Sequence, residues 1–379
     1  MLYDPELQHL ISFESGGRTS IQKASSPPEG ISCILRLALV FKCQVYVLDS
    51  IRSGLGLRTL QNGVYGRILK PIFDSLDIRH TYIATDSRHA IGDFALSLED
   101  SGVPIMVIIA GGDTSVNEFV NSLNKDQKGE IYIATVPEGT GNALALSNGC
   151  GEEKEAVKCI LLASVKRPLQ LYLVEFPSGS EVLHHDGLKE TLQGRLLFVV
   201  VASWAFHTSL VADSDTDEMR KHGINRFKIA AENNLTRPQK YCGDVTIGND
   251  RALQGPLAYF VVTPAQRFEP TFEILPRGNI HDSSLYVVAF QTEENDSYIM
   301  DIMGKVYAGG KHVDIPNVFY EEVKESENVI LSLGANLPLS QRRFCVDGAI
   351  VVIPETKESA VEIKYHGHTI GSWDLYIIS

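Results

Sequence analysis

Three short stretches of the sequence combine glycines with side chains that could handle a phosphate group. One of them, Gly111-Gly112-Asp113, ends the apolar run 105–110 and precedes a helical pattern. Glycine lets the backbone approach a ligand closely, and the N-terminus of a helix points N–H groups at an anion. A carboxylate there suits the base, or the group that orients a metal, in phosphoryl transfer. We interpret Asp113 as a candidate catalytic residue, and helix capping is the competing interpretation.

A second stretch, Gly139-Thr140-Gly141-Asn142, follows the apolar run 131–136 and opens another helical pattern. It offers backbone donors, a hydroxyl and a helix N-terminus to a phosphate or a ribose. A purely structural glycine turn is the alternative. We favour nucleotide binding because the stretch combines all three features.

The third stretch is SIRSGLG at 50–56, which follows the first predicted strand. Gly54 and Gly56 permit a loop whose N–H groups close on an anion, and Ser50 and Ser53 add hydroxyls. A plain turn between a strand and a helix explains the same residues. The stretch lacks the third glycine of a dinucleotide-binding fingerprint, so it does not by itself indicate that class of site.

The elements that must position these stretches follow from hydrophobic periodicity. Between residues 44 and 168, β-branched runs alternate with helical patterns, which predicts parallel strands and crossover helices in a three-layer α/β domain. Strands are predicted at 44–50, 80–86, 105–112 and 131–137, and helices at 60–76, 90–100, 115–124, 143–149 and 152–164. Such domains bind ligands at the carboxyl ends of their strands, where the three stretches lie.

After Pro168 the pattern changes to one strand after another. Residues 169–379 are therefore predicted to form a mostly antiparallel β-sandwich. Its strands are predicted at 169–176, 195–204, 241–248, 257–265, 284–290, 328–333, 343–354 and 360–367, with helical stretches near 215–235 and 294–308. Residues 1–43 show no clear period, and we assign them to an N-terminal extension of a strand or two and a loop.

Composition argues against several classes of protein. The chain has 44% hydrophobic and 21% charged residues, as folded globular proteins do, and its net charge of -13 argues against a nucleic-acid partner. The amino terminus lacks the basic start of a signal peptide, and the apolar runs are shorter than the roughly 20 residues that span a bilayer. We expect a cytoplasmic protein, with any membrane contact peripheral. The six cysteines lack metal-ligand spacing, so neither zinc nor disulfides are expected.

Together, these stretches resemble the catalytic domain of the diacylglycerol kinase and sphingoid long-chain base kinase family. GGDTSVNEFVNSL (111–123) is similar to the family pattern GGDGTxxEVxNGL, VPEGTGNALALS (136–147) to PxGTGNxLA, and SIRSGLG to NPxSGxG. Segments 203–227, 309–313 and 343–349 extend the resemblance, which spans about residues 44–354. It implies a two-domain lipid kinase, in which an α/β domain like those of NAD kinase and diacylglycerol kinase precedes the β-sandwich.

The resemblance also implies a role for each matching residue. Asp113 would be the base that takes the proton from a lipid hydroxyl, and Asp213 or Asp215 would hold the lipid head group. ATP would lie in the cleft between the domains, where Asp347 would position magnesium or the nucleotide. The residues implied to bind the nucleotide or its phosphates are Ser50, Ser53, Gly54, Gly56, Gly111, Gly112, Thr114, Glu118, Gly139, Thr140, Gly141, Asn142, Arg220 and Arg226.

The sequence departs from the family pattern at four places. Thr114 replaces a glycine in a loop that phosphates must approach, and Ala349 replaces the glutamate of the family's DGE. Ser50 and Ile51 stand where the family has Asn-Pro, and Ser283 replaces a glycine. These departures keep a non-catalytic member of the same fold among the alternatives.

Three hypotheses on function follow. The leading one is an ATP- and Mg²⁺-dependent lipid kinase that acts on a hydroxyl of a sphingoid base, ceramide, diacylglycerol or a similar amphiphile. The second is a pseudokinase that binds lipid or nucleotide without turnover, which Thr114 and Ala349 favour. The third is a kinase of a soluble alcohol, because related α/β folds phosphorylate nucleotides and sugars with similar Gly-Gly-Asp corners.

Overall fold

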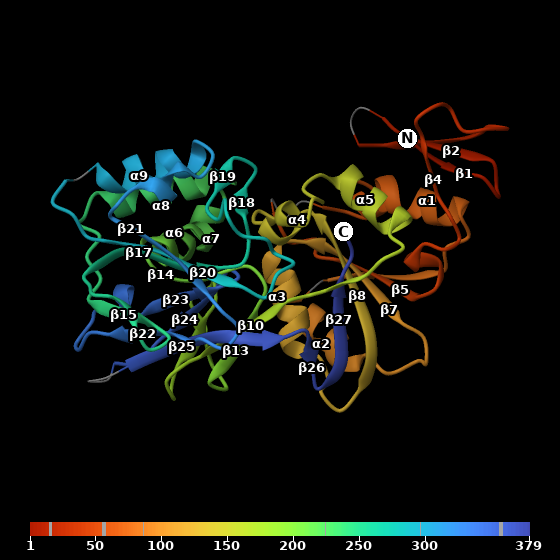
Figure 1. Ribbon diagram of the computed structural model, residues 1–379. Helices are drawn as coiled ribbons and strands as arrows, with labels where there is room; N and C mark the ends of the chain where they lie inside the picture. The colour runs from red at the N-terminus through yellow and green to blue at the C-terminus, as the bar shows by residue number, and fades with distance from the viewer. Residues whose placement is uncertain (15–16, 55–57, 86, 224, 296, 356–358) are drawn as a thin grey trace. The chain divides into compact units, whose positions relative to one another are not determined.

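The computed structural model describes residues 1–379 apart from 15–16, 55–57, 86, 224, 296 and 356–358. The chain divides into two compact units (Figure 1): unit 1 comprises residues 1–169 and 368–379, and unit 2 comprises residues 170–367. Within the described residues, none of the helices has the length and apolarity needed to cross a membrane.

Unit 1 is built on a mostly parallel sheet. Its strands follow the order β26-β27-β8-β7-β5-β6, and β9 also pairs with β27. Strands β27, β8, β7, β5 and β6 run parallel to one another, whereas β26 and β9 are antiparallel to β27. The strands are β5 Gln44–Asp49, β6 His80–Ala84, β7 Ile105–Gly111, β8 Lys128–Pro137, β9 Arg167–Pro168, β26 Thr369–Ile370 and β27 Ser372–Ile377. The parallel strands predicted within residues 44–168 are present.

The helices of unit 1 connect these strands. They are η1 Leu39–Phe41, η2 Tyr65–Leu69, α1 Lys70–Ser75, α2 Ala90–Ser97, α3 Asp113–Ser122, α4 Ala143–Ser147 and α5 Glu153–Leu162. Strand β7 is buried at every residue, as expected of a parallel strand whose two faces are both covered. Its unbroken apolar sequence therefore fixes the strand that carries Gly111 in the middle of the sheet.

Residues 1–43 form a small sheet of their own, in the order β3-β2-β1-β4. Its strands are β1 Leu2–Asp4, β2 His9–Phe13, β3 Thr19–Lys23 and β4 Ser32–Cys33. Leu2 and Ile11 are fully buried and belong to the same apolar cluster as the α/β core. The N-terminal extension is therefore an ordered part of unit 1, with more strands than the one or two predicted.

The carboxyl end of the chain returns to unit 1. Strand β27 pairs with β8 from Ser372 opposite Lys128 to Ile377 opposite Ile133. The predicted second domain, residues 169–379, is therefore corrected for residues 368–379, which belong to unit 1. An apolar strand pattern does not show which sheet the strand will join, so the sequence could not place this segment.

Unit 2 packs two antiparallel sheets around one core. The six-stranded sheet has the order β13-β10-β25-β22-β15-β16, and the eight-stranded sheet has the order β12-β11-β24-β23-β14-β17-β20-β21. The strands, including the separate pair β18-β19, are β10 Leu171–Glu175, β11 Glu181–Leu183, β12 Lys189–Thr191, β13 Arg195–Phe198, β14 Ala202–Ala205, β15 Gly243–Ile247, β16 Arg251–Leu253, β17 Leu257–Thr263, β18 Arg267–Glu269, β19 Phe272–Glu273, β20 Leu285–Gln291, β21 Val318–Val323, β22 Val329–Leu333, β23 Arg343–Val346, β24 Ala349–Val352 and β25 Ser359–Gly367. Val245 of one sheet and Phe260 of the other belong to a single buried cluster, which is the arrangement of a sandwich.

Unit 2 also contains several helices. They are α6 Phe206–Ser214, α7 Asp217–Arg220, α8 Asn225–Leu235, α9 Tyr298–Tyr307, η3 Lys311–Asp314 and η4 Leu339–Gln341. Figure 1 shows α6, α8 and α9 on the same side of the eight-stranded sheet, and α6 packs on β14, β17 and β23. The helical stretches predicted near 215–235 and 294–308 are confirmed. Helix α6 was missed because its apolar residues continue the preceding strand pattern.

The single strand predicted at 195–204 is in fact two strands in different sheets. Strand β13 belongs to the six-stranded sheet and β14 to the eight-stranded sheet. The chain passes from one sheet to the other at residues 199–201, which we call the sheet crossing. There the carboxylate of Asp347 accepts three backbone N–H bonds, from Val199 at 2.8 Å, Val200 at 2.9 Å and Val201 at 2.8 Å. An unbroken apolar run does not reveal such a crossing because both halves are buried.

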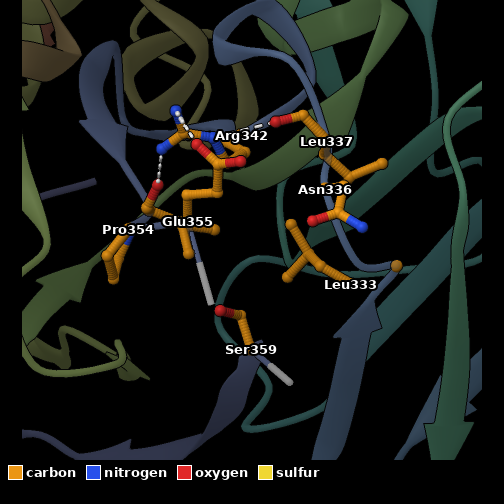
Figure 2. Close-up of a pocket in the computed structure, with 9 residues that line it drawn as sticks. Leu333, Asn336, Leu337, Arg342, Pro354, Glu355 and Ser359 are labelled. Atoms are coloured by element: carbon orange, nitrogen blue, oxygen red, sulfur yellow. Dashed lines mark hydrogen bonds and ion pairs between the residues drawn. The ribbon is translucent and has the colours of Figure 1, made fainter. Parts of the chain in front are cut away.

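A small pocket of unit 2 surrounds Arg342 (Figure 2). The guanidinium donates to the carbonyl oxygens of Leu337 at 3.1 Å and Ile353 at 2.7 Å, and it lies 3.9 Å from the Glu355 carboxylate. The pocket has a volume of about 10 Å³, which is the lower limit for a single water molecule. It is too small to be a nucleotide or lipid site.

Candidate active site

The three glycine-rich stretches meet at the carboxyl ends of β5, β7 and β8. We call them corner 1 (residues 50–54), corner 2 (111–113) and corner 3 (137–142). Corner 1 is joined to β7 by the Ser50 N–H, which donates to the Ala110 oxygen at 2.9 Å. Corner 3 is joined to corner 2 by the Asp113 N–H, which donates to the Gly141 oxygen at 3.1 Å. The predicted stretches therefore form one connected site.

Corner 1 places two hydroxyl groups side by side. The Oγ atoms of Ser50 and Ser53 lie 2.6 Å apart, and both residues are half-buried. Gly54 adopts φ +64°, and a Cβ at this position would lie 3.1 Å from the Glu138 oxygen. Glycine is therefore favoured here both by its backbone conformation and by the proximity of corner 3. Gly56, also predicted to bind phosphate, lies outside the described residues.

The glycines of corners 2 and 3 allow the two loops to touch. A Cβ on Gly112 would lie 2.7 Å from the Gly141 oxygen, and one on Gly139 would lie 2.6 Å from the Gly112 nitrogen. Gly111 is similarly confined, because its Cβ would lie 2.7 Å from the Ser115 hydroxyl oxygen. The sequence suggested that these glycines admit a ligand. In the structure, the absence of a Cβ at Gly112 and Gly139 leaves room for the backbone of the neighbouring loop, and its absence at Gly111 leaves room for the Ser115 side chain.

This packing predicts different outcomes for two alanine substitutions within corner 3. Gly139→Ala should destabilise unit 1 by about 1–3 kcal/mol, the usual cost of overpacking, because backbone atoms of corner 2 would have to move. Gly141→Ala is the matched control, because its Cβ would lie 3.6 Å from the nearest atom, an oxygen of Asp113. Thermal unfolding of both variants measures the difference. Equal midpoints would contradict the proposed contact between the corners.

Asp113 begins helix α3, but its side chain caps a different helix. Oδ2 accepts the Ala143 N–H at 2.8 Å and Oδ1 accepts the Leu144 N–H at 3.0 Å, both from the start of α4. Part of the residue is exposed, yet burial of its carboxyl raises the pKa of Asp113, and these two hydrogen bonds lower it. Two N–H groups predicted to face a phosphate thus donate to Asp113 instead. The role of Asp113 as a base stays a prediction.

Glu118, also on α3, holds a second neighbouring helix. Its carboxylate accepts the Gly92 N–H of α2 at 2.9 Å, and burial raises the pKa of Glu118. The two acids of α3 therefore fix the N-terminal turns of α4 and α2. Negative charge at these helix N-termini also interacts favourably with the helix dipole. Thr114, which replaces the family glycine, is exposed on the first turn of α3.

Asn142 shapes the turn of corner 3. Its amide donates to the Gly139 oxygen at 2.8 Å, and its Oδ1 accepts the Gly139 N–H at 3.0 Å. This reciprocal pair closes the turn and leaves Thr140 half-buried and Gly141 exposed at its tip. The tip is thus the part of corner 3 that an incoming phosphate could contact.

In unit 2, the predicted arginines meet at Asp215. Arg220 forms a bidentate pair with its carboxylate, with distances of 3.0 and 3.1 Å, and Arg226 lies 3.2 Å from Oδ1. Arg226 is only 9% exposed, and burial lowers its pKa while Asp215 opposes that effect. An anion that approached these arginines would have to compete with Asp215. Their contact with phosphate stays a prediction.

Asp213, the other predicted head-group acid, is held by different partners. Its carboxylate accepts hydrogen bonds from Arg343 at 2.6 Å and from the Asn234 amide at 2.9 Å. Asp213 and Asp215 therefore each belong to an acid–arginine cluster, and the geometry does not choose between them as the head-group residue.

Asp347 has a structural role in unit 2. It is 2% exposed, adopts φ +47° in the turn between β23 and β24, and binds the three N–H groups at the sheet crossing. Its predicted contact with magnesium or with the nucleotide stays a prediction.

A cavity of about 530 Å³ borders corner 3 at Pro137. Its wall carries acidic side chains such as Glu152 and basic ones such as Arg18 and Lys154. A volume of this size suits a small molecule, but the mixed charge does not select a phosphate. The corners, with their hydroxyls and exposed turn, fit a phosphate better.

Residues 58–174 match the family model described as the diacylglycerol kinase catalytic domain. The match contains corners 2 and 3, including Asp113, and begins after corner 1. This segment belongs to the diacylglycerol kinase catalytic domain family. This kinase domain is shorter than the 44–354 over which the motifs resemble the family, and it ends in β10 of unit 2.

Solved structures show the same fold around this kinase domain. A protein from Bacillus anthracis str. Sterne, described as a diacylglycerol kinase, is 15% identical with a TM-score of 0.60, and the match covers 88% of this chain and 96% of that chain. A diacylglycerol kinase from the same organism is 12% identical with a TM-score of 0.53 and the same coverage. At these identities the likeness shows the fold alone. A comparison with curated proteins finds no match.

Sequence reasoning missed one residue that connects corners 1 and 3 and lies near the end of β7. The guanidinium of Arg58 bonds to the Glu138 oxygen at 2.6 Å, to the Ser50 oxygen and to the Glu138 carboxylate, and it lies 3.5 Å from the Ala110 oxygen. It also lies 3.5 Å from Asp49, a buried acid whose pKa burial raises. No motif marks Arg58, because its partners are backbone oxygens that are distant in sequence.

Proposed function

We propose that the chain is an ATP-dependent kinase that transfers the γ-phosphoryl group to a hydroxyl of a lipid-like alcohol. The observation that carries the proposal is the joining of corners 2 and 3 by Asp113. This contact sets a carboxylate directly beside the exposed tip of corner 3. The matched catalytic domain supports a kinase, and the acceptor class is our proposal.

The residues of the site suit the demands of phosphoryl transfer. The reaction needs little covalent chemistry from the protein and depends on positioning and on stabilising negative charge. We infer that the hydroxyls of Ser50 and Ser53 and the turn at Thr140–Gly141 bind phosphate oxygens of ATP. Asp113 would take the proton from the acceptor hydroxyl at a carboxylate oxygen. Arg220 and Arg226 would neutralise phosphate charge, since arginine binds such oxygens in pairs.

Magnesium enters the proposal only as a partner of ATP. Across the residues that the structure describes, no group of three or more His, Cys, Asp or Glu side chains could hold a metal ion. Asp347, the predicted ligand, does not fit well because its carboxylate already accepts three N–H bonds. Magnesium commonly binds through one or two carboxylates together with substrate phosphates, so ATP itself would supply ligands. We assign no step to the metal.

The proposal predicts that purified protein with MgATP releases ADP when given an amphiphilic acceptor. Sphingoid bases, ceramide and diacylglycerol in detergent micelles should be compared with glycerol and other soluble alcohols. We expect release with at least one amphiphile and none above background with soluble alcohols. Release with a soluble alcohol alone would instead support the third hypothesis.

The same assay separates a kinase from a pseudokinase. If a folded protein released no ADP with any acceptor, the pseudokinase would be the better hypothesis. The double variant Thr114→Gly/Ala349→Glu restores the family residues at both departures. A large rise in turnover in this variant would show that those departures silence the natural chain, whereas an unchanged rate would show that they do not limit its turnover.

A further inference from the structure

Two cysteines of unit 1 lie almost within bonding distance of each other. Cys150 follows helix α4, and Cys159 lies on helix α5. Their Sγ atoms are 2.9 Å apart, with Cys150 placed to donate its S–H to Cys159. A disulfide bond is about 2.05 Å long, so the sulfur atoms would need to approach by roughly 0.9 Å. Both cysteines are free thiols in this structure.

The backbone around both cysteines is fixed. The Cys150 N–H donates to the Ala145 oxygen at 2.8 Å, which ties it to the end of α4. Asn148, two residues earlier, donates to the Ile378 oxygen at 2.7 Å. Cys159 lies in the second half of α5, between the buried residues Val157 and Ile160. The closeness of the two sulfur atoms therefore comes from the packed structure and not from a mobile loop.

The two thiols differ in access and in acidity. Cys150 is 2% exposed, whereas Cys159 is partly exposed. The hydrogen bond from Cys150 lowers the pKa of the Cys159 thiol, because it stabilises the thiolate. The thiolate is the form that attacks oxidants, and an oxidant must also reach it. Cys159 therefore has the properties of an attacking cysteine, and Cys150 those of a resolving one.

We propose that Cys150 and Cys159 are a peroxide-sensitive pair that forms an intramolecular disulfide. The Cys159 thiolate attacks one oxygen of hydrogen peroxide, the O–O bond breaks, and after protonation a sulfenic acid and one water result. The sulfur of Cys150 then attacks the Cys159 sulfur, the S–O bond breaks, and a second water leaves. Overall, two thiols and one hydrogen peroxide give one disulfide and two waters.

The position of the pair links it to corner 3. Helix α4 begins at corner 3, where Asp113 holds its first turn, and the pair tethers the end of α4 to α5. At the start of α5, Glu153 pairs with Arg67 at 2.8 Å, and Arg67 lies 3.8 Å from Glu138 of corner 3. The disulfide would thus close the short loop of residues 150–159, which joins α4, the helix that begins at corner 3, to α5. The inference rests on this geometry and does not depend on the proposed kinase activity.

The test is a mass measurement on the full chain after brief treatment with hydrogen peroxide and blocking of the remaining thiols. Lys154 and Lys158 lie between the two cysteines, so trypsin separates them into different peptides. We expect a cross-linked pair with a mass about 2 Da below the sum of the two reduced peptides, which a thiol reductant removes. The oxidised chain should also unfold a few degrees higher, because the loop is closed.

Two controls make the result specific. Cys43→Ser removes another partly buried cysteine and should leave the cross-link unchanged, whereas Cys159→Ser should abolish it. The same treatment of chain unfolded in guanidinium should give much less of this cross-link. The proposal is overturned if the blocking reagent still alkylates both cysteines after peroxide treatment, or if Cys159 is oxidised to a sulfenic, sulfinic or sulfonic acid without forming the disulfide. It is also overturned if the unfolded chain gives the same yield of cross-link.

Discussion

Replacing Asp113 with asparagine should lower turnover by about 100- to 10,000-fold, the range that a general base contributes. The amide has the same shape but does not accept the proton of the acceptor hydroxyl. It also places an NH₂ group where a backbone N–H of Ala143 or Leu144 now donates, which should cost about 1–3 kcal/mol of stability. ADP release and thermal unfolding measured on the same preparation give both quantities.

A matched control for Asp113 is available at Asp4. This buried acid of β1 also accepts two backbone N–H bonds, both at Oδ1, from Glu6 at 2.9 Å and Leu7 at 2.8 Å. Its Oδ2 lies 3.1 Å from the Arg36 guanidinium, an ion pair that asparagine would lose. Asp4→Asn should lose stability while its turnover stays within about twofold of wild type at temperatures where it is folded. If Asp4→Asn and Asp113→Asn lost turnover equally, the loss would reflect folding and Asp113 would not be the base.

The dependence of the rate on pH gives a second check on Asp113. A base works in its deprotonated form, so the rate should rise with pH through the pKa of Asp113. Burial raises that pKa, so the rising limb of the pH–rate profile should lie at higher pH than for an ordinary aspartate. Asp113→Asn should remove the limb from whatever activity remains. A limb that persisted in the variant would belong to another group.

The sequence was a good guide to the parts of the site that depend on local chemistry. Glycine-rich turns after apolar strands are local patterns, and the parallel sheet brings their carboxyl ends to one edge. Corners 2 and 3 were therefore predictable, as was their proximity. Their contact was not, because the need for glycine at Gly112 and Gly139 arises from backbone atoms of the other loop.

The parts that the sequence missed depend on contacts between distant residues. Arg58 binds backbone oxygens of Ser50 and Glu138, which any residue type supplies, so no pattern identifies it. Strand β27 pairs with β8 across more than two hundred residues of sequence, and its own pattern suits either sheet. The capping alternative for Asp113 concerned its own helix, whereas its carboxylate caps α4; its role as a base stays a prediction.

Asp347 should prove to be the acid whose loss most affects stability. Asp347→Ala would leave three N–H donors at the sheet crossing without their acceptor, at about 1–3 kcal/mol for each buried group. Allowing for some relaxation, we expect unit 2 to lose on the order of 4 kcal/mol. Asp347→Asn should lose less, because one amide oxygen can accept two of the three bonds and asparagine tolerates the positive φ.

The two tryptophans allow this loss to be assigned to a unit. Trp204 is buried in unit 2 and Trp373 in unit 1, so a Trp373→Phe background reports denaturant unfolding of unit 2 through Trp204 alone. In that background Asp347→Ala should shift the midpoint strongly and Asp347→Asn less. A variant with wild-type unfolding but reduced turnover would reverse the assignment, because it would show that Asp347 serves magnesium or the nucleotide instead of the sheet crossing. Comparing the unfolding midpoint with turnover in the two variants therefore decides between a structural and a catalytic role for the same carboxylate.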